Sequence, residues 1–141
     1  MGITIKTSKR GFDMGYGGFM RFRNKVAECV GNVFYEHYKN LSNAPFYGEE
    51  RTSFFKTYDY NTKMLINNGH VSLEIADFCY QPDCEGKINK EQAKMIYDFI
   101  KDCDDELIYG YSGRDDCCKM KHMKQLFKDC YSDSKQVVWW W

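Results

Sequence analysis

Apolar residues recur at helical spacing along most of this chain, and that periodicity limits it to a helix-rich fold. From Phe19 onward, apolar side chains return every three to five positions, which predicts one amphipathic helix running to about Lys39. Residues 52–68 keep a similar spacing and predict a second helix. Residues 70–80 fit both a strand and a helix, and we favour the helix.

Two more helices are predicted nearer the C-terminus. Asn89 and Gln92 have the spacing of a capping box, and apolar positions follow them at helical intervals. The acidic run that comes next is expected to end this helix, because negative charge at a helix C-terminus opposes the helix dipole. Either Asp115 or Asp116 is expected to cap the last helix, which carries an apolar stripe over residues 120–130.

Short strands are predicted at the two ends of the sequence. Ile3 and Ile5 alternate with polar residues, and residues 137–141 form an apolar run with three tryptophans. The glycines within 11–18 are expected to interrupt regular structure. We therefore predict an α+β fold: a helix-dominated single globular domain over residues 1–141, with about four helices and a small sheet that pairs the N-terminal strand with the C-terminal strand.

Cysteine usage suggests a reducing compartment. The chain has seven cysteines, an odd number, and most of them fall within apolar stretches, as free thiols in a core do. No apolar run resembles a secretory or membrane-spanning segment, so we expect a cytoplasmic protein that does not enter a membrane. Cys79, Cys84, Cys118 and His122 offer thiol and imidazole ligands, but they lack the Cys-x2-Cys pairs of common zinc sites.

The charge is balanced overall but graded along the chain. Residues 1–40 contain seven Lys/Arg and three Asp/Glu, whereas residues 71–141 contain ten and fourteen. Such polarity can orient a partner during encounter. The net charge of zero argues against nucleic acid as that partner, because general nucleic-acid binders rely on a basic footprint.

A glycine-rich turn, Gly15–Arg23, precedes the first predicted helix and is a candidate anion site. Backbone N–H groups at Gly17 and Gly18 can approach an anion, and Arg21 and Arg23 would add charged donors. The spacing matches neither the P-loop nor the dinucleotide fingerprint. The alternative reading is a tight entry turn with no ligand.

Residues 81–92 partly resemble an EF-hand loop. With Gly86 at the sixth place, the candidate metal ligands Asp83, Glu85 and Asn89 fall at the third, fifth and ninth places. The first and twelfth places hold glutamines, which removes most of the charge that holds calcium. We therefore expect a helix-loop-helix turn that binds no metal, and we expect no cofactor elsewhere.

Aromatic residues are unusually frequent at 17 %, and several lie near predicted loops and ends. Tyr, Trp and Arg dominate binding hot spots because they bury much area at low entropic cost. The candidate partner-binding residues are Tyr109, Tyr111, Trp139, Trp140 and Trp141. No catalytic motif is present, so enzyme activity would require catalytic residues scattered along the chain.

The turns at Gly15–Arg21 and at 83–86 are similar to segments of small uncharacterised proteins of bacteria and their phages. The resemblance implies a non-enzymatic accessory protein of a phage or mobile element that binds and inhibits a host protein, for example a component of host defence. A nucleotide- or anion-binding module built on the glycine turn is the alternative, and a small enzyme is the third.

Overall fold

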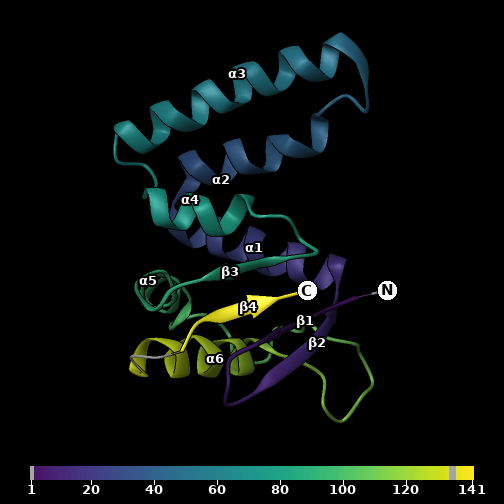
Figure 1. Ribbon diagram of the computed structural model, residues 1–141, viewed down its shortest axis with the longest axis vertical. Helices are drawn as coiled ribbons and strands as arrows, with labels where there is room; N and C mark the ends of the chain where they lie inside the picture. The colour runs from purple at the N-terminus through teal and green to yellow at the C-terminus, as the bar shows by residue number, and fades with distance from the viewer. Residues whose placement is uncertain (1, 134–135) are drawn as a thin grey trace.

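The computed structural model describes residues 2–133 and 136–141, and the described part has an α+β fold (Figure 1). The elements, in chain order, are β1 (Gly2–Lys6), β2 (Gly11–Gly15), α1 (Tyr16–Val30), α2 (Asn32–Lys39), the 3-10 helix η1 (Asn40–Asn43), α3 (Gly48–Asn67), α4 (Leu73–Tyr80), β3 (Gly86–Ile88), α5 (Lys90–Ile100), α6 (Met120–Ser132) and β4 (Val138–Trp140). The predicted fold class is thus confirmed, with more helices than the four expected.

The sheet is antiparallel and has the strand order β2-β1-β4-β3. Strand β4 lies beside β1 with Ile5 opposite Trp140, so the predicted pairing of the two ends is confirmed. Strand β2 was missed, because five residues of the glycine-rich stretch form a hairpin with β1. Strand β3 was missed inside the loop that resembles an EF-hand.

The core lies between the inner face of the sheet and the helices that cover it. Alternation along β1 buries Ile3 and Ile5, and the Trp140 side chain of β4 points to the same side. The Trp140 ring packs against Phe19 of α1 and Phe78 of α4, at centroid distances of 5.2 and 5.9 Å. Helix α3 forms the outermost layer at the end of the molecule opposite the sheet (Figure 1).

Four predictions about helix boundaries were wrong, one of them the start of α3, which lies at Gly48 and not at residue 52. The helix expected from Phe19 to Lys39 is two helices, because Gly31 adopts a φ of 150° that side chains rarely allow and so separates α1 from α2. Helix α1 also starts earlier, at Tyr16. Helix α6 starts at Met120 after Lys119, so neither Asp115 nor Asp116 caps it.

Two local predictions were confirmed. Residues 70–80 contain helix α4, which begins after Ser72, whose hydroxyl accepts a hydrogen bond from the backbone N–H of Ile75. The capping box before α5 is complete: Asn89 Oδ1 accepts from the N–H of Gln92, and Gln92 Oε1 accepts from the N–H of Asn89. Among the described helices, none has both the length and the apolar character that a membrane span requires.

Candidate functional site

The outer face of the sheet gathers two of the predicted tryptophans with two lysines. In the antiparallel register, Trp139 of β4 lies between Lys6 of β1 and Lys87 of β3. Trp141 follows and exchanges two backbone hydrogen bonds with Thr4, at 3.0 and 3.2 Å. We call the surface formed by Lys6, Lys87, Trp139 and Trp141 the tryptophan face.

The Lys6 side chain contacts both tryptophans of this face, of which Trp139 is half-buried and Trp141 exposed. Its Nζ atom lies 4.7 Å from the centroid of the Trp141 ring and 5.6 Å from that of Trp139. A cation over an indole face is attracted by the ring quadrupole, so the contact with Lys6 restrains each ring. Trp141 is still 50 % exposed, and Lys87 is exposed as well. A cavity of ≈ 420 Å³ adjoins these side chains.

The remaining predicted partner residues divide between core and surface. Trp140 and Tyr109 are 1 % and 5 % exposed, so the structure corrects their expected place at the surface. Trp140 points inward because neighbouring strand residues alternate between faces, and Tyr109 packs edge-on against Phe22 at 5.3 Å. Tyr111 is exposed, and its hydroxyl lies over Gly2 at the far end of the outer face. Tyr111 thus lies over the same sheet face but outside the tryptophan face.

The glycine turn is part of helix α1 rather than a loop. Gly17 and Gly18 lie in the first turn of that helix, and Gly18 is buried against the backbone carbonyl of Tyr109. A Cβ atom at Gly18 would overlap this carbonyl oxygen. The turn therefore serves close packing between α1 and the segment that contains Tyr109. Arg21 is exposed on the same helix, where its Nη2 donates to the carbonyl of Ile108 at 3.4 Å.

Arg23 points into the core, away from Arg21. It is 6 % exposed, and its Nη1 donates to the carbonyls of Cys79 and Gln81 at 3.1 and 2.7 Å. Its Nη2 donates to the carbonyl of Pro82, which also accepts a bond from the indole of Trp140. Burial lowers the pKa of the guanidinium. Carbonyls at the end of α4 compensate its charge, so Arg23 acts as a structural clamp.

The side-chain amide of Gln81 binds the backbone of the loop that resembles an EF-hand. The carbonyl of Lys87, at the seventh place, where an EF-hand presents a ligand, accepts from Gln81 Nε2 at 2.7 Å. Asn89 is engaged in its capping box, while Asp83 and Glu85 are exposed. Among residues 2–133 and 136–141, no three His, Cys, Asp or Glu side chains are grouped as a metal site requires.

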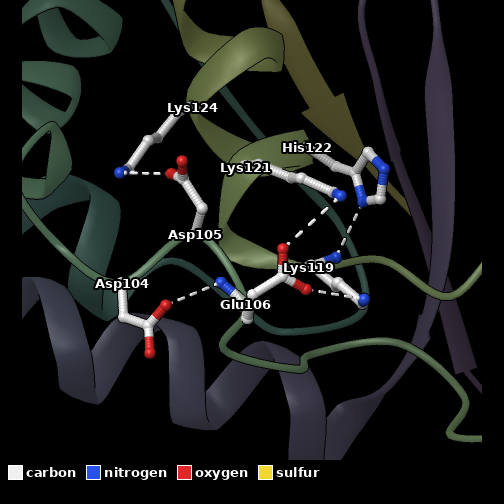
Figure 2. A network of polar contacts seen from close by, with 7 residues as sticks. All are labelled: Asp104, Asp105, Glu106, Lys119, Lys121, His122 and Lys124. Atoms are coloured by element: carbon white, nitrogen blue, oxygen red, sulfur yellow. Dashed lines mark hydrogen bonds and ion pairs between the residues drawn. The ribbon is translucent and has the colours of Figure 1, made fainter.

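Figure 2 shows an ion-pair network that fastens the segment before α6 to that helix. Glu106 pairs with Lys119 at 2.8 Å and with Lys121 at 3.6 Å. Lys124 of α6 pairs with Asp105 at 2.6 Å and also donates to the carbonyl of Cys103. The two carboxylates, Asp105 and Glu106, are 58 % and 60 % exposed, so each pair contributes little stability by itself. Together they hold the chain on either side of the segment that bears Tyr109 and Tyr111.

His37 and His122 make hydrogen bonds to groups other than thiols. His37 Nε2 bonds to the Thr62 hydroxyl at 2.6 Å, and His122 Nδ1 accepts from the N–H of Lys119. Burial lowers the pKa of both imidazoles. All seven cysteines are free, and burial raises the pKa of Cys118 to about 12.

Searches against family models, curated proteins and solved structures found no match to this chain.

Proposed function

We propose that this chain is a non-enzymatic accessory protein of a phage or mobile element that binds and inhibits a protein in the host cytoplasm. The tryptophan face is its contact surface. The observation that carries the proposal is the placement of Lys6 Nζ beside the rings of both Trp139 and Trp141. Partly exposed aromatic side chains that are already ordered bind at a reduced entropic cost, as hot-spot residues do.

The charges of this face indicate the chemistry of the partner. Lys6 and Lys87 flank Trp139 on its two sides, so a partner that presents an acidic group beside an apolar or aromatic one is complementary to the face. Asp13, at the β2 edge, already accepts a hydrogen bond from the Thr4 hydroxyl at 2.6 Å. Because the Asp13 carboxylate would repel a second negative charge, the acidic group of the partner is expected beside the lysines and not at the β2 edge.

Affinity capture with matched variants tests the proposal. The immobilised wild-type chain is expected to retain a stoichiometric protein from a host lysate. Trp141→Ala should weaken its affinity about 10-fold or more, which is typical of a hot-spot aromatic residue. Phe46→Ala is the control, because Phe46 is 92 % exposed in the connection before α3, at the end of the molecule away from the sheet (Figure 1).

Three results would contradict the proposal. Equal binding by Trp141→Ala and the wild type would exclude the tryptophan face, and loss of binding in Phe46→Ala alone would move the contact to the other end. Quenching of tryptophan fluorescence by a single-stranded oligonucleotide, with micromolar affinity, would assign the face to base stacking instead. Circular dichroism and thermal melting of both variants establish that each one is folded.

A further inference from the structure

Two cysteines that are far apart in the chain have neighbouring sulfur atoms. The Sγ atoms of Cys29 and Cys103 lie 3.5 Å apart, although the residues are separated by 74 positions. Both side chains are partly exposed, whereas Cys79, Cys117, Cys118 and Cys130 are buried. We propose that Cys29 and Cys103 are a site of oxidative modification, which a peroxide converts into an intramolecular disulfide.

The two sulfur atoms need only a short approach to form the bond. A disulfide has an S–S length of about 2.05 Å, so the two sulfur atoms must approach by about 1.5 Å. Cys29 is the next-to-last residue of α1, directly before the break at Gly31. Cys103 lies outside α5, in a turn where its N–H donates to the carbonyl of Ile100. Neither sulfur is therefore carried by the middle of a rigid helix.

The position of Cys103 is held from the other side by α6. Lys124 Nζ donates to the carbonyl oxygen of Cys103 at 2.6 Å. The same Nζ pairs with Asp105 (Figure 2). The bond to the carbonyl attaches the Cys103 backbone to α6, while the contact of its sulfur with that of Cys29 connects it to α1. The pair is thus built by contacts among α1, the end of α5 and α6.

The reaction balances with hydrogen peroxide as the oxidant. One thiol loses its proton and its sulfur attacks a peroxide oxygen, giving a sulfenic acid and one water molecule. The second sulfur then attacks the sulfenic sulfur, forms the S–S bond and releases the hydroxyl group, which leaves as a second water with the thiol proton. The two thiols lose two electrons in total, and one peroxide molecule is reduced to two waters.

The electrostatic environment of Cys29 makes the oxidation of this thiol pair slow. Burial and the neighbouring Cys103 thiol raise the pKa of Cys29 to about 12, while the charge of Lys25 acts in the opposite direction. A cavity of ≈ 280 Å³ is lined by Lys25 and Glu28, the two charged residues that act on Cys29. The oxidation rate should therefore rise with pH, because the thiolate is the reacting form.

A disulfide here would tie the end of α1 to the turn after α5 and enclose every element from α2 to α5, including β3, in one covalent loop. A crosslink across a long loop restricts the unfolded chain strongly and stabilises the folded state. The oxidised protein should therefore melt at a higher temperature, by about 5 °C or more. The tryptophan face lies outside this loop apart from Lys87, so the inference does not depend on the proposed function.

The test uses the full chain with Cys84→Ser, which removes the exposed thiol that would link two molecules. After treatment with hydrogen peroxide, the intact mass should fall by two hydrogens, and alkylation of the denatured chain should then add four groups instead of the six that the reduced chain takes up. Trypsin should release residues 26–39 joined to residues 102–114, because each peptide contains one cysteine of the pair. Dithiothreitol should reverse both the crosslink and the rise in melting temperature.

Cys29→Ser and Cys103→Ser, each made in the same background, are the matched controls. Each should fold with the melting temperature of the reduced parent within a few degrees and should show neither the mass loss nor the stabilisation. Failure of the parent to lose two hydrogens would overturn the proposal. So would a crosslink between other cysteines, or a disulfide that lowers the melting temperature.

Discussion

The guanidinium of Arg23 donates to the carbonyl oxygen of Gln81 at 2.7 Å, which joins the first long helix to the residue that follows α4. Arg23 and Gln81 are 58 positions apart, so this one buried cation fixes the relative positions of two helices and the start of the loop to β3. The Gln81 side chain in turn bonds to both the N–H and the carbonyl of Lys87. The edge strand of the tryptophan face is therefore held in place from the core.

Arg23→Ala should be strongly destabilising, because it leaves the carbonyls of Cys79 and Gln81 without their charged donor. We expect the free energy of unfolding to fall by about 3 kcal/mol. Urea denaturation followed by tryptophan fluorescence measures it. Arg21→Ala is the matched control and should change stability by less than about 0.5 kcal/mol, because Arg21 is exposed. Similar effects of the two substitutions would show that Arg23 is not a structural clamp.

The adjacent glycines of α1 should respond to alanine in opposite directions. Gly18→Ala should lower the free energy of unfolding by about 1–3 kcal/mol, because the new methyl group overlaps the Tyr109 carbonyl. Gly17→Ala should raise it by up to about 1 kcal/mol, since alanine favours the helix and has space there. Thermal denaturation of both variants provides the comparison, and a shared sign would argue against the close contact of α1 with Tyr109.

The cysteines should react with a thiol reagent in an order set by burial. Cys84 is exposed and should be modified first by Ellman's reagent in the folded protein. Cys118 should remain protected until unfolding, because it is buried and its pKa is raised to about 12. Mass spectrometry after timed quenching identifies the modified residue. Early labelling of Cys118 would mean that its surroundings open readily.

Stability should decrease on mild acidification because of His37. Burial lowers the pKa of its imidazole below the ordinary value of 6.5, so the unfolded chain binds the proton more readily than the folded chain. The contribution is present above pH 6.5 and is lost as the pH falls through and below that value. Urea unfolding at pH 7.5 and pH 5.5 should show a smaller difference for His37→Gln than for the wild type. An unchanged difference would assign the pH dependence to other groups.

Local interactions explain the features that were correctly predicted from the sequence. The capping box of Asn89 and Gln92 uses residues three positions apart, and the helical spacing of residues 70–80 is completed by the cap at Ser72. The errors arose where the structure depends on contacts between residues that are distant in the sequence. Whether the glycine-rich stretch is a turn or a strand depends on its pairing with β1. The break at Gly31 lets α2 bury Phe34 and Tyr38 in the core, and that packing involves the rest of the fold.

The candidate site shows the same division. Sequence composition singled out Trp139, Trp140 and Trp141 as one group, but the strand geometry turns Trp140 into the core and leaves its two neighbours on the outer face. Likewise, Arg21 and Arg23 appeared equivalent as anion ligands. Their helix directs one to solvent and the other under α4.

The sequence by itself determined the α+β class, most of the helices, and the strands at the two ends, because side-chain periodicity and capping act over a few residues. Only the tertiary structure decided which side chains meet. It brought Lys6 to Trp141 from the two ends of the chain, and Cys29 to Cys103 across 74 positions, because strand register and helix packing bury a common core. Such contacts depend on the whole fold, and no local pattern in the sequence specifies them.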